Sequence, residues 1–447
     1  MRPATRRALV GGAIVVVVAA AAVLWFLRGP GPMAFADGPK VALADYKGAD
    51  PTGVPASLAK ASLVERGEYL ARAADCMVCH TVPGGKPYAG GLAFKLPFGT
   101  LYSTNITPDK ETGIGNYSDQ EFLDSIHRGV RRDGARLYPA MPFVSYTYIT
   151  DADALAIKAY LFSLAPVRAA APANTLMFPF NQRWAMTFWS VLFNRDKRFE
   201  PDSDKSPEWN RGAYLAEALA HCGECHTPRN LAFALDNREK FGGAVAAGWH
   251  AYNISSDKGT GVGAWSDEQL VSYLSTGHAT GRGTASGPMG EAVDESFSQM
   301  APEDISALVA YLRSVPAVAS SEPATLAPPA SQSSKSGGTA DARGKMVFQG
   351  ACVSCHGWTG ESPLTPFSTL TGARAVNDPG AINVAQIVIS GTKRQSPPGA
   401  LSMPAFGSAY SDEEIAAVAN YVTARFGSKG SRITEQDVAA LRKQTSQ

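Results

Sequence analysis

The sequence has no excess of charge of either sign, and this excludes several kinds of partner. Its 447 residues contain 41 Lys and Arg against 40 Asp and Glu, so the formal net charge is +1. Proteins that bind nucleic acids or anionic lipid surfaces carry basic patches or a strongly basic balance. This nearly neutral chain is therefore not predicted to bind nucleic acid.

The sequence also lacks convincing runs of alternating apolar and polar residues, which disfavours a protein built from half-buried strands. Apolar residues recur instead at helical spacing, as in the segment from Ser57 to Ala74. A chain of 447 residues suggests about three domains at ~100–200 residues each. We therefore expect a mainly α protein with several domains.

Cysteine is scarce, and none is left over for a disulfide. The six cysteines all fall in three copies of Cys-x-x-Cys-His, at 76–80, 222–226 and 352–356. This motif is the attachment signature of a c-type haem, in which two thiols bond one porphyrin and the adjacent imidazole binds the iron. We therefore predict three covalent haems c. The predicted haem-binding residues are Cys76, Cys79, His80, Cys222, Cys225, His226, Cys352, Cys355 and His356.

Two other kinds of site use pairs of cysteines. A zinc site needs two Cys-x-x-Cys pairs ~15–20 residues apart, whereas these motifs lie more than a hundred residues apart. A thioredoxin-like dithiol occurs once, in a βαβ setting, and needs no histidine. The histidine in every copy favours haem over both alternatives.

The N-terminus carries an uncharged apolar run of nineteen residues, from Leu9 to Leu27, after three arginines. In a helix with a rise of ~1.5 Å per residue, such a run reaches about 28 Å, close to the ~30 Å hydrocarbon core of a bilayer. We predict a signal anchor or transmembrane helix at 1–28. The alternative is a cleaved signal peptide, with Ala34-Phe35-Ala36 as the cleavage site. In both cases the haem domains are expected on the periplasmic side of a bacterial inner membrane.

The first two motif-bearing segments are copies of each other. Asn105-Ile106-Thr107 corresponds to Asn253-Ile254-Ser255, and Ser118-Asp119 to Ser266-Asp267, both 148 positions later. A repeated period indicates duplicated structural units. Each unit is predicted to contain a helix, the motif, a Gly- and Pro-rich loop, a capped helix, a Met-containing loop and a final helix.

These patterns predict how the chain is divided. The predicted segments are a transmembrane segment at 1–28, a spacer at 29–56, a first domain at 57–166, an aromatic connector at 167–206, a second domain at 207–315, a flexible linker at 316–340, a third domain at 341–427 and a polar tail at 428–447. The linker prediction rests on a composition of Pro, Ser, Ala and Gly without aromatic residues. The connector is the most aromatic part of the chain, and an exposed aromatic patch of this kind marks a contact surface for a partner if it is not buried between domains.

A second iron ligand decides whether a haem reacts with small molecules or only transfers electrons. Each unit has one Met beside Pro or Gly in the loop before its last helix: Met141, Met289 and Met403. Met141 and Met289 are 148 positions apart and therefore occupy the same place in the repeat. We predict iron ligation by the pairs His80 with Met141, His226 with Met289, and His356 with Met403. The four histidines outside the motifs (His127, His221, His250 and His278) are interpreted as surface or locally satisfied residues.

The chain resembles the three-haem cytochrome c subunit of bacterial membrane-bound dehydrogenases, the alcohol dehydrogenase and gluconate dehydrogenase type. The resemblance rests on the segments Gly67-Glu68-Tyr69-Leu70-Ala71-Arg72, Tyr102-Ser103-Thr104-Asn105-Ile106-Thr107, Leu137-Tyr138-Pro139-Ala140-Met141-Pro142-Phe143, Phe178-Pro179-Phe180-Asn181, Trp209-Asn210-Arg211-Gly212-Ala213-Tyr214-Leu215 and His226-Thr227-Pro228-Arg229-Asn230. It implies three tandem class I cytochrome c domains, here after an N-terminal transmembrane helix.

The resemblance further implies a function in electron transfer. Electrons would pass from the catalytic subunit of a periplasmic dehydrogenase (a quinoprotein, flavoprotein or molybdenum enzyme), through three haems, to membrane ubiquinone or a terminal oxidase. No catalytic site is expected in the chain itself. Two alternatives stay open, a c-type cytochrome subunit of a terminal oxidase and a multihaem peroxidase. The peroxidase is disfavoured because it needs an open iron site, while all three units offer a Met ligand.

Overall fold

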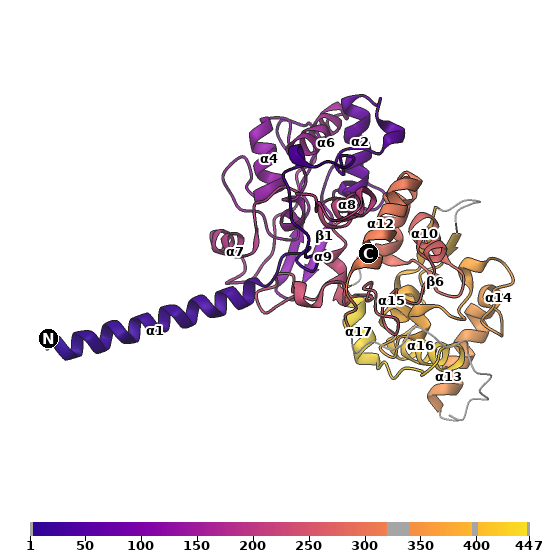
Figure 1. The fold of residues 1–447 in the computed structure, drawn as a ribbon. Coiled ribbons are helices and arrows are strands. Elements are labelled where there is room, and N and C mark those ends of the chain that lie inside the picture. Colours follow the sequence, from indigo (N-terminus) through magenta and orange to yellow (C-terminus); the bar gives the residue numbers. More distant parts are fainter. Residues whose placement is uncertain (1–2, 320–338, 396–400, 445–447) are drawn as a thin grey trace.

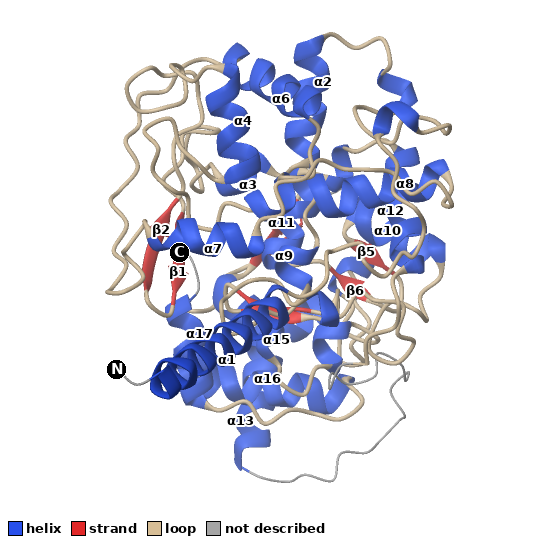
Figure 2. Cartoon of the chain, turned by 60° about the vertical axis from the view of Figure 1, so that its left-hand side comes forward, coloured by secondary structure: helices blue, strands red, loops and turns tan. Residues whose placement is uncertain are grey.

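The computed structural model describes residues 3–319, 339–395 and 401–444 and is mainly helical, as the sequence predicts (Figures 1 and 2). Helix α1 spans Pro3–Arg28. The first unit contains α2 (Leu63–Ala73), α3 (Cys76–Cys79), β1 (Ala93–Leu96), β2 (Gly99–Tyr102), α4 (Asp119–Arg128), α5 (Phe143–Tyr146) and α6 (Asp151–Ser163). The connector carries α7 (Ala185–Phe193).

The second unit repeats this order and adds a hairpin. It contains α8 (Pro207–Tyr214), α9 (Gly223–His226), β3 (Ala244–Ala246), β4 (Trp249–Ala251), α10 (Asp267–Thr276), β5 (His278–Ala279), β6 (Gly283–Thr284), α11 (Gly287–Glu295) and α12 (Pro302–Ser314). The third unit contains α13 (Thr339–Val347), α14 (Val353–His356), α15 (Ile382–Ser390), β7 (Thr392–Arg394), β8 (Leu401–Met403) and α16 (Asp412–Phe426), and α17 (Glu435–Gln444) follows it in the predicted tail. Short π-helical segments at Leu215–Leu219 and Phe348–Cys352 precede the second and third motifs.

Within the described residues, the strands form four two-stranded antiparallel hairpins that the sequence does not predict. In β1 and β2, for example, Ala93 pairs with Tyr102 and Leu96 with Gly99. Such strands are only two to four residues long, too short to show the alternation by which half-buried strands are identified.

The predicted capping signals do start helices. Ser118 and Glu121 form a complete capping box at α4, and Ser266 and Gln269 form one at α10. The first helix of the first unit, α2, begins at Leu63 rather than at Ser57, because Ser62 and Glu65 form a capping box at its start. Side-chain caps of this kind satisfy amide groups that would otherwise have no partner, and so they fix where a helix begins.

In each unit the first helix crosses the last one at a glycine. A Cβ at Gly67 would overlap the carbonyl oxygen of Ala156, and the same holds for Gly212 with Ala307. In the third unit Gly344 lies in the same way against Ala417. The three units therefore share one crossing, although the third is not a close copy in sequence.

The first two units share a continuous apolar core, and two hydrogen bonds join them reciprocally. Tyr69 of the first unit donates to Asp304 of the second at 2.6 Å, and Tyr214 of the second donates to Asp153 of the first at 2.6 Å. All four residues are buried. Because Tyr69 and Tyr214, like the two aspartates, occupy matching places in the repeat, the units meet through the same surface, as two subunits do about a two-fold axis.

The N-terminal segment requires a correction. In Figure 1, α1 projects from the folded body. Among the described residues, no helix combines the length and the apolar character needed to cross a membrane. The transmembrane helix predicted at 1–28 is therefore wrong, although the stretch is helical over Pro3–Arg28.

The segments between and beside the units also take part in the fold. Lys40, in the predicted spacer, pairs at 2.7 Å with the buried Asp202. The C-terminal helix α17 buries Val438 and Leu441 against the third unit. The predicted linker at 316–340 lies mostly outside the described residues, but Val318 at its start accepts a hydrogen bond from Asn253 at 2.8 Å.

Candidate haem sites

The thiols of each motif lie on one helical turn at the end of the unit's first helical segment. Cys76 and Cys79 bound α3, Cys225 lies in α9 and Cys355 in α14. None of the six cysteines forms a disulfide. Residues three apart on a turn project from the same face, so each pair presents two thiols to one ligand. This is the arrangement that attachment to two vinyl groups requires.

The three motif histidines make equivalent hydrogen bonds. The distance from Nδ1 to a backbone carbonyl oxygen is 2.6 Å for His80 with Thr104, for His226 with Tyr252 and for His356 with Ser368. A carbonyl oxygen only accepts, so Nδ1 carries the proton in each ring. The lone pair of Nε2 is therefore left for a metal, and the ring is held in a fixed orientation.

Burial keeps these groups neutral. It raises the pKa of Cys76 and of Cys222 to about 12 and that of Cys352 to about 11. It lowers the pKa of His80 and His356, so their imidazoles are uncharged at neutral pH. Redox dithiols and zinc thiolates have depressed thiol pKa values, so these cysteines suit thioether formation instead. The part of the chain that the structure describes also has no group of three or more His, Cys, Asp or Glu able to hold a metal.

The predicted methionine ligands lie in their own units, in different local structures. Met141 lies in the turn before α5, Met289 in the first turn of α11, and Met403 at the end of β8. Met141 and Met289 pack against the same core as Cys76 and Cys222. Met403 and Cys352 pack together against the core of the third unit. Each unit thus supplies a thiol pair, an oriented imidazole and a partly buried thioether.

Helix α5 of the first unit contacts the regions of both the first and the second motif, since the hydroxyl of Tyr146 donates to the carbonyl of Ala74, just before the first motif, at 2.6 Å. Ser145 of the first unit donates to Glu224, inside the second motif, at 3.0 Å. The ring of Tyr146 lies 5.4 Å from that of His221, which immediately precedes Cys222. This proximity is suited to electron transfer between two haems, and the sequence does not reveal it.

Asp75, directly before the first motif, is another residue that the sequence analysis missed. Its backbone is left-handed, with φ 55°. Burial, and secondarily Glu291 and Glu295 of α11, raise its pKa to about 7. The two glutamates come from the second unit, so only the tertiary structure brings the three carboxyl groups together. The equivalent residue before the second motif is His221, with φ 40°.

The histidines outside the motifs have mixed surroundings. His127 is buried, and burial lowers its pKa to about 4. Nδ1 of His221 lies 2.8 Å from the carbonyl oxygen of Leu219. His250 and His278 both contact the third unit: His250 lies 3.0 Å from Asp378, and the ring of His278 lies 4.9 Å from that of Phe367.

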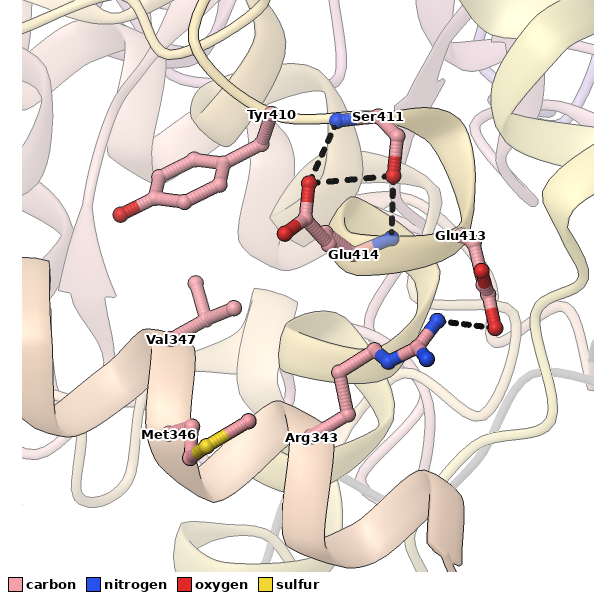
Figure 3. A pocket seen from close by; sticks show the side chains of 7 residues that line it. All are labelled: Arg343, Met346, Val347, Tyr410, Ser411, Glu413 and Glu414. Atoms are coloured by element: carbon pink, nitrogen blue, oxygen red, sulfur yellow. Dashed lines mark hydrogen bonds and ion pairs between the residues drawn. The ribbon is translucent and has the colours of Figure 1, made fainter.

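A depression on the third unit is separate from the haem residues (Figure 3). Its floor is the start of α16, where Ser411 and Glu414 form a capping box, and Arg343 pairs there with Glu413. The exposed Met346 also lines it. Apart from the hydroxyl of Tyr410, which also lines the depression, its polar side chains are engaged in helix capping or in this surface ion pair.

Comparison with known proteins gives the same picture. The Cytochrome c family model matches residues 64–165 and 342–425. The fructose dehydrogenase cytochrome subunit of Gluconobacter japonicus is 38% identical over 421 residues, covering 88% of this chain and 85% of the relative. The gluconate 2-dehydrogenase cytochrome c subunit of Pantoea cypripedii is 38% identical over 400 residues, covering 86% of this chain and 90% of the relative.

A third relative, one of the subunits of the nicotinate dehydrogenase of Pseudomonas putida, is longer. It is 41% identical over 368 residues, which are 82% of this chain and 30% of that protein. The chain therefore corresponds to less than a third of that relative's length. With the covalent haem motifs in place and relatives of similar length matched almost end to end, the chain belongs to the family of cytochrome c subunits of alcohol, gluconate and fructose dehydrogenases.

Proposed function

We propose that the chain carries three covalent haems c and relays electrons from the catalytic subunit of a dehydrogenase to the respiratory chain. The observation that carries this proposal is the threefold recurrence of a Cys-x-x-Cys-His turn whose histidine donates Nδ1–H to a carbonyl at 2.6 Å. Each haem supplies an iron that gains and loses one electron. The chain's own residues hold that iron and set the field around it.

The roles of the side chains follow from their chemistry. The cysteine pairs would hold each porphyrin, and Nε2 of His80, His226 and His356 would bind its iron. Met141, Met289 and Met403 would supply a second ligand; a thioether ligand raises the reduction potential of a haem. With both protein ligands bound, the iron would transfer electrons and would leave no position for oxygen or peroxide.

The haem count is tested by mass spectrometry of the mature chain. The expected result is three haem additions, and C352A/C355A should leave two. The ligands are tested on the reduced protein: M289A should lower one potential and admit carbon monoxide at that haem. A wild type that already binds carbon monoxide at one haem would contradict the Met assignment.

The donor is proposed to be a dehydrogenase catalytic subunit, as the names of the relatives suggest. We place the haem units on the periplasmic side of the bacterial inner membrane, where c-type haems are attached, and take ubiquinone or a terminal oxidase as acceptor. Membranes supplied with the dehydrogenase substrate should reduce these haems before the quinone pool. Reduction only through quinol would reverse the direction of electron flow and overturn the proposal.

The aromatic connector offers a surface for this donor. Phe178, Trp184, Phe188 and Val191 are all exposed, by 66–77%. The connector is nevertheless held firmly, because Phe180 stacks on Phe98 at 4.0 Å and Trp189 donates to Ala232 at 2.8 Å. Rigid exposed aromatic side chains are typical of the anchors of protein interfaces.

The donor surface is tested by W184S/F188S, which should weaken copurification of the catalytic subunit without changing the haem spectrum. L364S removes an equally exposed apolar side chain from the third unit and serves as the matched control. Equal loss of the partner in both variants would exclude the connector as the docking surface.

A further inference from the structure

The third unit is docked on the second through buried polar contacts. The amide of Gln386, which is fully buried, donates to the carbonyl of Gly248 at 2.9 Å. Asn383 accepts from the backbone of His250 at 2.8 Å and donates back to its carbonyl at 2.9 Å. Paired contacts of this kind, between a side chain of one unit and the main chain of the other, fix the orientation of the third unit relative to the second, which a flexible linker alone would not do.

One side chain of the third unit enters the second unit deeply. Arg394, at the end of β7, has a side chain that is 2% exposed and pairs with Asp294 of α11, whose side chain is 9% exposed, at 2.8 Å. It also donates Nη1–H to Ala285 at 3.3 Å and Nη2–H to Thr276 at 3.2 Å. Thr276 ends α10, Ala285 precedes α11, and Asp294 lies within α11, so these contacts surround the segment that carries Met289.

The second unit has space for this guanidinium because Gly277 lacks a side chain: a Cβ there would overlap the guanidinium of Arg394. Gly290 lies beside the same group, since a Cβ there would make an ordinary contact with Nη1 at 3.4 Å. Gly290 immediately follows Met289 in the chain. Gly290, which lies beside the guanidinium, and the proposed ligand Met289 are therefore in the same turn of α11.

The same hairpin of the third unit carries that unit's own methionine. In the pairing of β7 with β8, Thr392 lies opposite Met403 and Arg394 opposite Leu401. A displacement of this hairpin thus affects two haem environments together. The geometry points to Arg394 as a positioning residue that acts from the third unit to hold the Met289 segment of the second, so that docking of the third unit secures the ligand of the second haem. This inference rests on the proposed ligation by Met289.

The physical reason is the cost of an unpaired buried charge. Removing the guanidinium takes the ion-pair partner from Asp294, which keeps the backbone N–H of Gln395 at 3.0 Å. It also takes a donor from the carbonyls of Ala285 and Thr276. The loss of an ion pair with so little exposure favours a rearrangement of α11, and Met289, in the first turn of that helix, would no longer be held in place to bind iron.

The experiment compares R394Q with R313Q in the full haem-loaded chain. Arg313 is a matched control, because it too binds one carboxylate and two carbonyls: Asp267 at 2.7 Å, Val262 at 3.0 Å and Trp265 at 2.5 Å. R394Q should raise carbon monoxide binding by the reduced protein at least about tenfold, as the loss of a buried ion pair implies. It should also lower one haem potential and weaken the Met-to-iron charge-transfer absorption, while R313Q does neither.

M289A separates the two proposals, and R394K covers the case in which R394Q does not fold. If M289A changes the spectrum and R394Q or R394K does not, the positioning role of Arg394 is wrong and the ligand assignment stands. If M289A changes nothing, the assignment itself is wrong. R394K keeps the charge and should give an effect between wild type and M289A, and the double variant R394Q/M289A should bind no more carbon monoxide than M289A alone. Equal effects of R313Q and R394Q would reduce the result to general destabilisation and overturn the inference.

Discussion

At the scale of single residues, the hydrogen bond of the motif histidine fixes the tautomer of its ring, which the sequence of the motif does not determine. The carbonyl acceptors belong to Thr104, Tyr252 and Ser368, which follow their histidines by 24, 26 and 12 residues. The loop between them differs in length and sequence from unit to unit, yet it returns a carbonyl to the same nitrogen at the same distance. The tautomer of the iron ligand is therefore a property of the folded loop.

Asp75 makes stability depend on pH. Its pKa rises from 3.8 to about 7 on folding, mainly through burial. The folded state therefore binds a proton that the unfolded state has released, and stability falls as pH rises from about 4 to about 7. We expect D75N to be more stable than wild type by about 4 kcal/mol at pH 8 and to differ little below pH 4.

The measurement is denaturant unfolding of both proteins across that pH range. D133N is the control, because Asp133 is an exposed carboxylate paired with Arg131 at 2.9 Å. A difference between D75N and wild type that is constant with pH would show that Asp75 does not titrate as proposed.

The motif and the repeat single out candidate chemistry-bearing residues in the sequence, but they do not indicate the neighbours of these residues. The cysteines and histidines are fixed by a local motif, and Met141 and Met289 by a shared place in a repeat. The contacts of Asp75 with Glu291, and of His250 with Asp378, join residues more than a hundred positions apart. No periodicity or spacing encodes such pairs, because they exist only after the units have packed.

At the scale of elements, the crossing of the first and last helices depends on one glycine per unit. In the third unit a methyl group at Gly344 would meet the carbonyl of Ala417 and the Cβ of Tyr421. Both are held inside the apolar core, so the helices must separate. Overpacking of this kind costs typically ~1–3 kcal/mol.

We therefore expect G344A to destabilise the third unit by about 2–3 kcal/mol. G350A is the matched control, because nothing lies within 4 Å of a Cβ there and the residue does not have a positive φ. Thermal unfolding followed at the haem absorption of the third unit distinguishes the two. Equal stability of G344A and wild type would mean that the helices can separate at no cost.

Helix starts were predictable where a cap is encoded in adjacent residues, as at Ser118 with Glu121. The hairpins were not predictable, because pairs such as β5 with β6 contain two residues each and are defined by their partners. The apolar run at the N-terminus shows the opposite failure: composition predicted a membrane span there, which the structure does not support.

At the scale of the whole molecule, the first two units form one body and the third docks on it. The repeat predicted two similar units, but it did not indicate that Tyr69 and Tyr214 exchange hydrogen bonds with Asp304 and Asp153. Nor does the composition of the linker reveal the docking of the third unit, since a Pro- and Ser-rich composition does not indicate how the units on either side of it pack. These contacts depend on surface shape, which a single sequence does not display.

The reciprocal pair predicts non-additive mutations. Y69F and Y214F each leave a buried aspartate without one donor, at a cost of about 1–3 kcal/mol. Once one of these bonds is lost, the interface is looser and the second bond is weaker, so Y69F/Y214F should cost less than the sum of the single variants. Urea unfolding of the three variants measures this, and strict additivity would show that the two bonds do not share an interface.

The resemblance of the first two units to a symmetric pair of subunits has a consequence for the direction in which charge moves. Two identical copies would hold their electrons at equal energy, and neither would be upstream of the other. Because both copies lie in one chain, each can change without the other: the left-handed residue before the first motif is the acid Asp75, while its counterpart is the imidazole of His221. In a single chain the surroundings of the two haems can therefore differ, so that one haem can have the lower reduction potential and act as electron donor to the other.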